Sequence, residues 1–127
     1  MHDVDRVPGA EEEALLERLR GITARLPGTQ VVIDGFGHRV FKVGAKSMIF
    51  VGAGNGVHPH LSIKTDRLTQ DALIRRGGWH RTPYIGQHGW ISADAAPPDA
   101  LDWDTIEELV TDAWRAVAPK KVVRGFQ

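Results

Sequence analysis

The stretch HRVFKVGAKSMIFV, residues 38–51, decides the fold. In its first half, Phe41 and Val43 share one face while His38, Val40 and Lys42 share the other, which is the two-residue period of a strand. Gly44 and Ala45 then predict a tight turn, and residues 47–51 are apolar throughout, as in a strand buried on both faces. Because two strands joined by a short turn pair antiparallel, this stretch predicts a hairpin near the centre of a sheet.

Strand patterns continue on both sides of this hairpin. Residues 31–34 form a short apolar run that ends in an Asp34-Gly35 turn, and the glycine-rich residues 52–56 suit a second hairpin loop. Residues 58–64 alternate again, with Leu61 and Ile63 directed at the core. The opposite face of this strand would then carry His58, His60, Ser62 and Lys64. A last hairpin is expected from residues 79–85 and 89–93.

Three helices complete the pattern. Residues 11–26 carry a helical stripe of Leu15, Leu19, Ile22 and Leu26. A second helix, capped by Thr65 or Asp66 and running to about residue 76, would bury Leu68, Ala72 and Leu73. The third begins at Asp102 or Asp104, where Asp104 with Glu107 would make a capping box, and ends before Pro119. Its buried stripe would be Ile106, Leu109, Val110, Ala113, Trp114 and Val117.

The order of these elements predicts the fold class. It reads helix, four strands, helix, two strands, helix, and short connections favour antiparallel pairing. We therefore expect an α+β domain with an antiparallel sheet of about six strands flanked by helices. The 127 residues suit one domain, 1–127, with residues 1–8 frayed.

Composition excludes several classes of protein. The chain has no cysteine, so disulfides, thiol chemistry and cysteine-ligated metal centres are ruled out. No apolar run approaches the roughly 20 residues of a membrane-spanning helix, and residues 1–10 lack the apolar segment of a secretory signal. We therefore expect a cytoplasmic protein with no membrane partner.

The charges are balanced overall but unevenly distributed. The chain carries 16 basic and 16 acidic residues, yet residues 36–93 hold eight lysines and arginines against Asp66 and Asp71. The flanking segments, 1–35 and 94–127, are each acidic by three charges. This segregation favours a basic sheet face flanked by acidic helices, a surface suited to phosphates.

Catalytic and metal-binding patterns are incomplete. His58 and His60 would project two imidazoles from one face of a strand, but no further ligand at a recognised spacing supports a metal site. Ser47, Ser62 and Ser92 lie inside expected strands and lack the glycine-flanked elbow of a nucleophilic serine. The sequence thus predicts a non-enzymatic protein without a metal or cofactor.

Several short motifs, in order, resemble the MmcQ/YjbR family. Phe41-Lys42-Val43-Gly44-Ala45-Lys46 resembles its F-x-V-G-x-K hairpin, and Leu61-Ser62-Ile63-Lys64 its L-x-L-K strand. The late hairpin with Gly89-Trp90 and the closing run from Ala113 to Lys120 look similar to those of the family as well. The resemblance spans roughly residues 10–123, and it implies a frataxin-like α+β fold, also described as a double-wing DNA-binding domain.

These observations predict a binding module of the MmcQ/YjbR type that contacts DNA without sequence specificity. Phosphates would be bound by the cations of the middle segment, and a histidine and a tryptophan would touch bases or sugars. The expected contact residues are Lys42, Lys46, Lys64, Arg67, Arg75, Arg76, Arg81, His88 and Trp90. The alternative is an adaptor that binds a small molecule or a protein in a cleft between the sheet and the helices.

Overall fold

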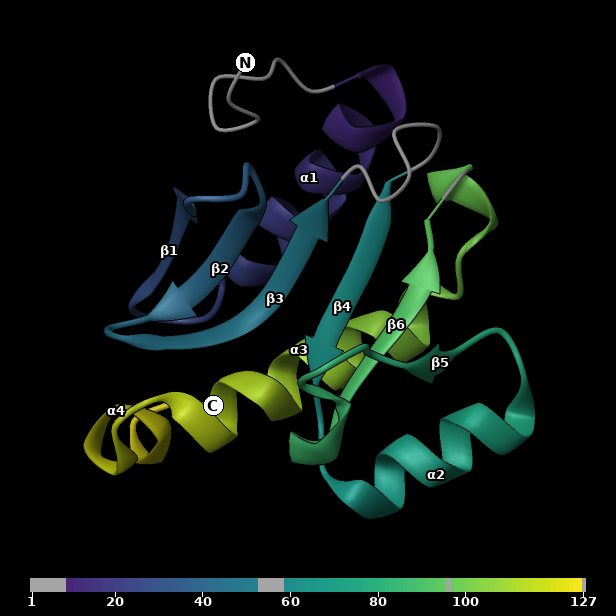
Figure 1. Cartoon of the computed structure of the whole chain (residues 1–127). Helices are drawn as coiled ribbons and strands as arrows, with labels where there is room; N and C mark the ends of the chain where they lie inside the picture. Colours follow the sequence, from purple (N-terminus) through teal and green to yellow (C-terminus); the bar gives the residue numbers. More distant parts are fainter. Residues whose placement is uncertain (1–8, 53–58, 96, 127) are drawn as a thin grey trace.

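A single antiparallel sheet organises the chain in a computed structural model that describes residues 9–52, 59–95 and 97–126. Its six strands follow the order β1-β2-β3-β4-β6-β5 (Figure 1). Their bounds are β1 Thr29–Ile33, β2 Arg39–Val43, β3 Lys46–Gly52, β4 His60–Lys64, β5 His80–Arg81 and β6 Trp90–Asp94. The expected fold class, number of strands and order of elements are confirmed. The expectations for residues 1–8, for His58 and for the glycine-rich loop at 53–56 lie outside the described residues.

Two long helices cover one face of the sheet. Helix α1, Ala10–Thr23, and helix α3, Trp103–Val117, both contact β3 and each other, and Figure 1 shows them behind the sheet. Helix α2, Arg67–Arg76, lies beside β5 at one edge, and the short α4, Lys120–Arg124, follows α3. The face turned away from α1 and α3 is called the open face below.

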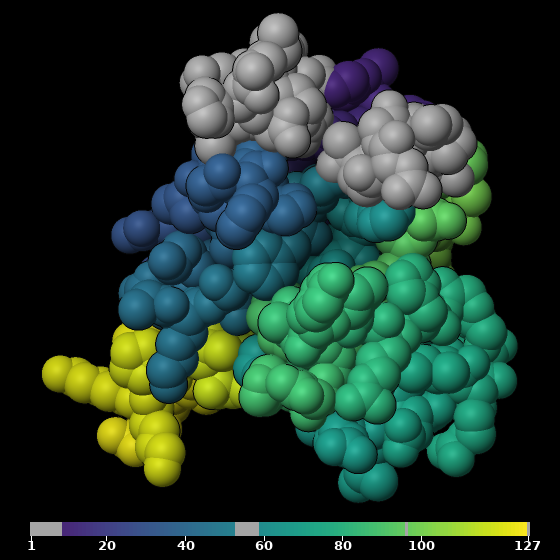
Figure 2. Space-filling view, viewed as in Figure 1, coloured from purple at the N-terminus to yellow at the C-terminus, as the bar shows by residue number. Residues whose placement is uncertain are grey.

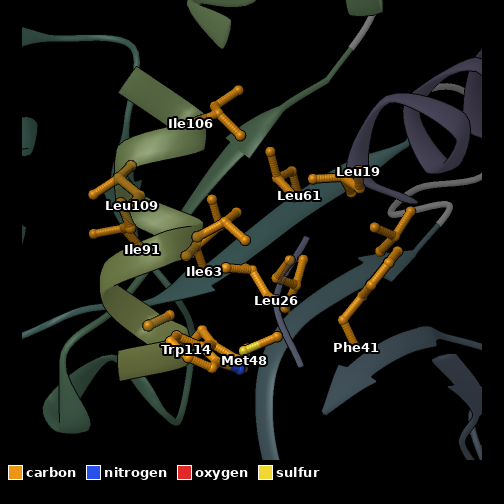
Figure 3. Packing of buried hydrophobic residues seen from close by; sticks show 14 of the residues in the cluster. Leu19, Leu26, Phe41, Met48, Leu61, Ile63, Ile91, Ile106, Leu109 and Trp114 are labelled. Carbon is orange, nitrogen blue, oxygen red and sulfur yellow. The ribbon is translucent and has the colours of Figure 1, made fainter. Parts of the chain in front are cut away.

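The hydrophobic core lies between the sheet and these helices. One register row, Phe41, Ile49, Ile63 and Ile91, crosses β2, β3, β4 and β6, and all four side chains are fully buried. From the helices, the expected stripes of α1 and α3 pack against this row, as Figure 3 shows for Leu19, Ile106 and Trp114. Ile22 is half-buried at the edge of the core.

A bulge explains the continuous apolar run of the central hairpin. The register between β2 and β3 shifts after Phe41, so one extra residue is accommodated in β3. Met48 and Ile49 are consequently both fully buried in the core, although neighbours in a regular strand would point to opposite faces. Phe50 then returns to the open face.

Aspartates cap both α2 and α3. The Asp66 carboxylate accepts from the Thr69 backbone N–H at 2.7 Å, and Asp102 accepts from that of Thr105 at 3.2 Å. The hydrogen bond from the Thr69 N–H lowers the pKa of Asp66. The pKa of Asp102 is lowered most by the Thr105 hydroxyl, which donates at 2.7 Å, and then by the Thr105 N–H. Of the two caps expected for α3, Asp102 is confirmed, and the alternative capping box at Asp104 is wrong because the helix already begins at Trp103.

The buried face of α2 also differs from the expectation. Leu68 is 83% exposed and Ala72 is exposed, whereas Gln70 and Leu73 are buried. Because α2 lies at an edge of the sheet, only a narrow stripe of it meets other elements. The last hairpin is likewise irregular, since β5 has only two residues and a turn with the 3-10 helix Gly86–His88 leads to β6.

Candidate binding sites on the open face

The centre of the open face is neutral rather than basic. One register row places Val40, Phe50, Ser62, Ser92 and His80 side by side across β2, β3, β4, β6 and β5. The next rows place Gly52 beside His60, and Lys64 beside Trp90. The expected basic sheet face is therefore wrong for the middle of the sheet, where hydroxyl, imidazole and aromatic groups stand between apolar neighbours.

A pocket of about 220 Å³ opens in this neutral region. Its floor comes from β3, β4 and β6, and its side wall comes from β5 and the residues after it. In Figure 2 the green segment that follows β5 protrudes beside the blue and teal strands. The described residues that line this open-face pocket are His38, Phe50, Gly52, His60, Ser62, His80, Thr82, Pro83 and Ser92.

Three hydroxyl groups form a chain along one wall of the pocket. The Ser92 Oγ lies 2.7 Å from the Ser62 Oγ and 2.7 Å from the Thr82 Oγ1. Both serines are buried, and the register of β4 and β6 sets them directly opposite each other. The chain therefore links the sheet floor to the segment after β5 by hydrogen bonds between short, rigid side chains.

Two of the three histidines in the pocket are oriented by carboxylates. His38 Nδ1 lies 3.0 Å from an Asp34 carboxylate oxygen, and His60 Nε2 lies 3.3 Å from one of Asp94. Partial burial raises the pKa of Asp34, but the hydrogen bonds from His38 and from the backbone N–H of Phe36 outweigh it and leave the pKa lowered. A Cβ at position 52 would lie 2.5 Å from the ring of His38, so Gly52 is needed for this ring position.

The expected cations separate into two groups. Because strands alternate in direction, the end of β2, the start of β3 and the end of β4 lie at the same end of the sheet, and α2 starts there. This end, called the basic end below, carries Lys42, Lys46, Lys64 and Arg67. Helix α4, with Lys120, Lys121 and Arg124, lies towards the same end of the molecule (Figure 1).

The remaining expected contact residues lie elsewhere. Arg75 and Arg76 are at the far end of α2, and Arg76 pairs with Asp102 at 3.3 Å. Arg81 lies on β5 against Gly86. His88 is exposed in the turn before β6. Trp90 is only 6% exposed and packs against Phe50 at 5.0 Å, so it presents no free ring face, and the expected stacking role does not fit the structure.

A smaller cleft lies between the basic end and α3. It has a volume of about 130 Å³ and is lined by the end of β4, the first turn of α2 and one side of α3, including Lys64, Asp66 and Asp112. This is the kind of cleft between sheet and helices that an adaptor would use, although it is far below the 300–1,000 Å³ of typical ligand pockets.

The described residues carry neither a metal-binding cluster nor a membrane-spanning helix. Across residues 9–52, 59–95 and 97–126, no three histidine, aspartate or glutamate side chains gather closely enough to hold a metal ion. In the same part of the chain, no helix is both long and apolar enough to cross a bilayer.

Sequence reasoning found parts of the open-face pocket but not the whole. It placed His60, Ser62 and Lys64 on one face of β4, which the structure confirms. It missed that Thr82 and His80 complete the pocket, because the irregular path after β5 leaves no periodic signal. The shared register row of Ser62 and Ser92 depends on strand pairing between segments about 30 residues apart.

Comparison with known proteins agrees with this fold. The crystal structure of Deinococcus radiodurans protein DR2400, with a DUF419 domain, superposes with a TM-score of 0.68 at 18% identity, covering 84% of this chain and 80% of that one. No curated protein matches the chain. The model of the YjbR family matches residues 24–116, from the end of α1 through most of α3. The chain therefore belongs to the YjbR family.

Proposed function

We propose that this protein is a non-enzymatic, cytoplasmic binding module that contacts nucleic acid through its phosphates. The observation that carries the proposal is the basic end, where β2, β3, β4 and the start of α2 place Lys42, Lys46, Lys64 and Arg67 at the same end of the sheet. Phosphate contact is the main source of sequence-independent affinity for nucleic acids, and lysine and arginine supply it. The lack of cysteine suits a reducing compartment.

The cations of the basic end are available to a ligand. Within the part of the chain that the structure describes, no carboxylate pairs with any of the four. Lys46 and Arg67 are exposed, and Lys64 donates to the backbone carbonyl of His88 at 3.2 Å and lies 5.9 Å from the centre of the Trp90 ring. Binding a phosphate therefore breaks no internal ion pair.

Several acidic residues lie at the other end of the sheet, whereas Asp66 and Asp112 line the cleft beside Lys64. Asp34 follows β1 and Asp94 ends β6, so both lie at the opposite end of the sheet, and the acid-rich first turn of α1 lies on that side as well (Figure 1). The segregation seen along the sequence thus supports an end-to-end polarity of the molecule. The electrostatic field of such a charge distribution orients an approaching polyanion towards the basic end.

The spacing of the cations suits a short stretch of backbone. Along α2, Arg75 lies about 12 Å from Arg67, at about 1.5 Å per residue. Phosphates of one strand recur about every 3.4 Å along a duplex. Helix α2 alone would therefore span about three to four phosphates, with Arg75 as a peripheral contact beyond the basic end.

A pair of charge-matched variants tests the proposal. Lys46→Gln/Arg67→Gln removes two exposed cations from the basic end, and Arg18→Gln/Arg20→Gln removes two from α1, behind the sheet. In titrations of a labelled duplex, the first variant is expected to flatten the dependence of log K on log salt by about two units, and the second to leave it unchanged. Equal effects of the two variants would reject a localised site.

A further inference from the structure

The open-face pocket has a wall chemistry that differs from that of the basic end. None of its described lining residues is a lysine, arginine, aspartate or glutamate. The nearby carboxylates of Asp34 and Asp94 are each engaged by a histidine of the pocket. A charged ligand would therefore lose its hydration without meeting an opposite full charge, so the wall favours an uncharged ligand.

The pocket nevertheless offers both donors and acceptors. Each of the three hydroxyl groups can donate one hydrogen, and the two hydrogen bonds among them take up two of these three hydrogens. Whichever way the chain runs, one hydroxyl hydrogen remains for a further acceptor. The His80 ring makes no hydrogen bond to the described residues, so it adds one donor and one acceptor when neutral.

The remaining wall is flat and aromatic. Phe50 is half-buried, and its ring is held between Trp90, at a centroid distance of 5.0 Å, and His38, at 6.1 Å. These contacts fix the orientation of the ring without covering it on the pocket side. At about 220 Å³, the cavity lies below the usual 300–1,000 Å³ of drug-sized ligands, which suits a single planar ring system.

An uncharged planar ring with donors and acceptors at its edge is the chemistry of a nucleobase. We propose that the open-face pocket binds one nucleobase, with its face against Phe50 and its edge on the hydroxyl chain and His80. The ring belongs either to a free nucleoside or to an unpaired nucleotide of a strand, and only the second form rests on the phosphate contact proposed above.

The position of the pocket relative to the basic end allows the strand-bound form. Lys64 and Ser62 point to the same face of β4, two residues apart, which is about 7 Å along a strand. A phosphate bound at Lys64 would therefore have its own or the adjacent base beside the pocket. A base inside a duplex is stacked and paired, so this arrangement selects single strands.

The inference is tested by mapping ligand contacts on the whole protein. Adenosine and thymidine are titrated into the ¹⁵N-labelled chain, and the backbone amide shifts are followed by NMR. Binding with a Kd of about 0.1–1 mM is expected, as for a weak, fragment-sized ligand, with the largest shifts at Phe50, Ser62, Thr82 and Ser92. No shift at these residues with either nucleoside at about 10 mM, or with single-stranded DNA, would overturn the proposal.

Two substitutions separate the pocket from general effects on the protein. Thr82→Val removes the end of the hydroxyl chain at constant volume, and Phe50→Leu replaces the aromatic wall by an aliphatic one. Each is expected to weaken nucleoside binding about five-fold or more, as the loss of a stacking or hydrogen-bonding partner does. Thr111→Val on α3, whose hydroxyl bonds the Glu107 carbonyl away from the pocket, is the matched control and should leave binding unchanged. Equal affinities in all three variants would overturn the assignment.

The same titrations separate this inference from the proposed function. Nucleoside shifts in the pocket together with salt-independent or absent DNA binding would support the pocket and reject the phosphate contact. Salt-dependent DNA binding that leaves the pocket amides unshifted would do the reverse. Tighter binding of single strands than of duplex at equal salt, abolished by Phe50→Leu, supports both.

Discussion

The side-chain amide of Gln70, on α2, donates to the backbone carbonyl of Trp90, the first residue of β6, at 2.9 Å. The same Nε2 donates to the Gly86 carbonyl at 2.7 Å, and Gln70 is only 1% exposed. This buried amide is therefore what fixes α2, the turn before β6 and the edge of the sheet relative to one another.

Replacing this amide is expected to destabilise the protein. Gln70→Ala should lower the free energy of unfolding by about 2–4 kcal/mol, because it leaves a cavity and removes two buried hydrogen bonds. Gln30→Ala, at an exposed position of β1, is the control and should change it by less than about 0.5 kcal/mol. Urea unfolding of both variants provides the comparison, and equal midpoints would show that the amide does not hold these elements.

Trp114 anchors α3 to the turn after α1. Its indole is fully buried, and Nε1 donates to the Pro27 carbonyl at 2.8 Å. Trp114→Ala is expected to cost about 3–5 kcal/mol, the range for a large core aromatic. A thermal midpoint like that of the wild-type protein would contradict this packing.

Gly89 is required by the close approach of two segments. Its φ is +94°, and a Cβ there would collide with the backbone carbonyl of Thr65, while its own carbonyl accepts from the Thr65 backbone N–H at 3.0 Å. Gly89→Ala should therefore cost about 2–4 kcal/mol through strain and overpacking. Gly21→Ala, in α1 with nothing near the added Cβ, should instead stabilise by about 0.5–1 kcal/mol. Calorimetric melting that ranks the two variants in the opposite order would refute the assigned backbone geometry.

The lowered pKa of Asp34 leads us to expect that the protein loses stability in acid. Its pKa in the folded protein is lower than in the unfolded chain, where aspartate titrates near about 3.9, so folding favours the ionised form. The stabilisation is complete above that unfolded pKa and disappears as the pH falls through the lower folded pKa. The difference in unfolding free energy between wild type and Asp34→Asn should accordingly be present at neutral pH and shrink in strong acid. A difference that stays constant with pH would mean that the carboxylate charge contributes nothing.

Much of the fold was predictable because its signals are local. The alternation of Phe41 with Val43, the cap at Asp66 and the stripe around Trp114 each lie within one element, and the structure confirms them. Of the three inward positions expected on α2, Leu73 is confirmed, whereas Leu68 and Ala72 were wrong because the burial of α2 depends on its place at the edge of the sheet. Apolar Leu68 stays in solvent, while polar Gln70 is buried by partners 16 and 20 residues away.

For the candidate sites as well, local composition was predictable but the arrangement in space was not. The excess of cations in residues 36–93 was readable from composition, but their arrangement was not, because only strand direction brings Lys42, Lys46 and Lys64 to one end. The contact that buries Trp90 comes from Phe50 of β3, a partner that the neighbours of Trp90 in sequence do not show. The open-face pocket likewise requires the pairing of β4 with β6, which no short motif encodes.

The salt dependence of DNA binding by the wild-type protein tests the central claim most directly. A labelled duplex is titrated by fluorescence anisotropy at several salt concentrations. With about four phosphates neutralised at the basic end, log K should fall with log salt at a slope of about −3 to −4, with a Kd of about 10⁻⁴–10⁻⁶ M. The absence of binding at about 100 μM protein in low salt, or a slope near zero, would contradict the phosphate contact and favour an adaptor that uses the cleft beside α3.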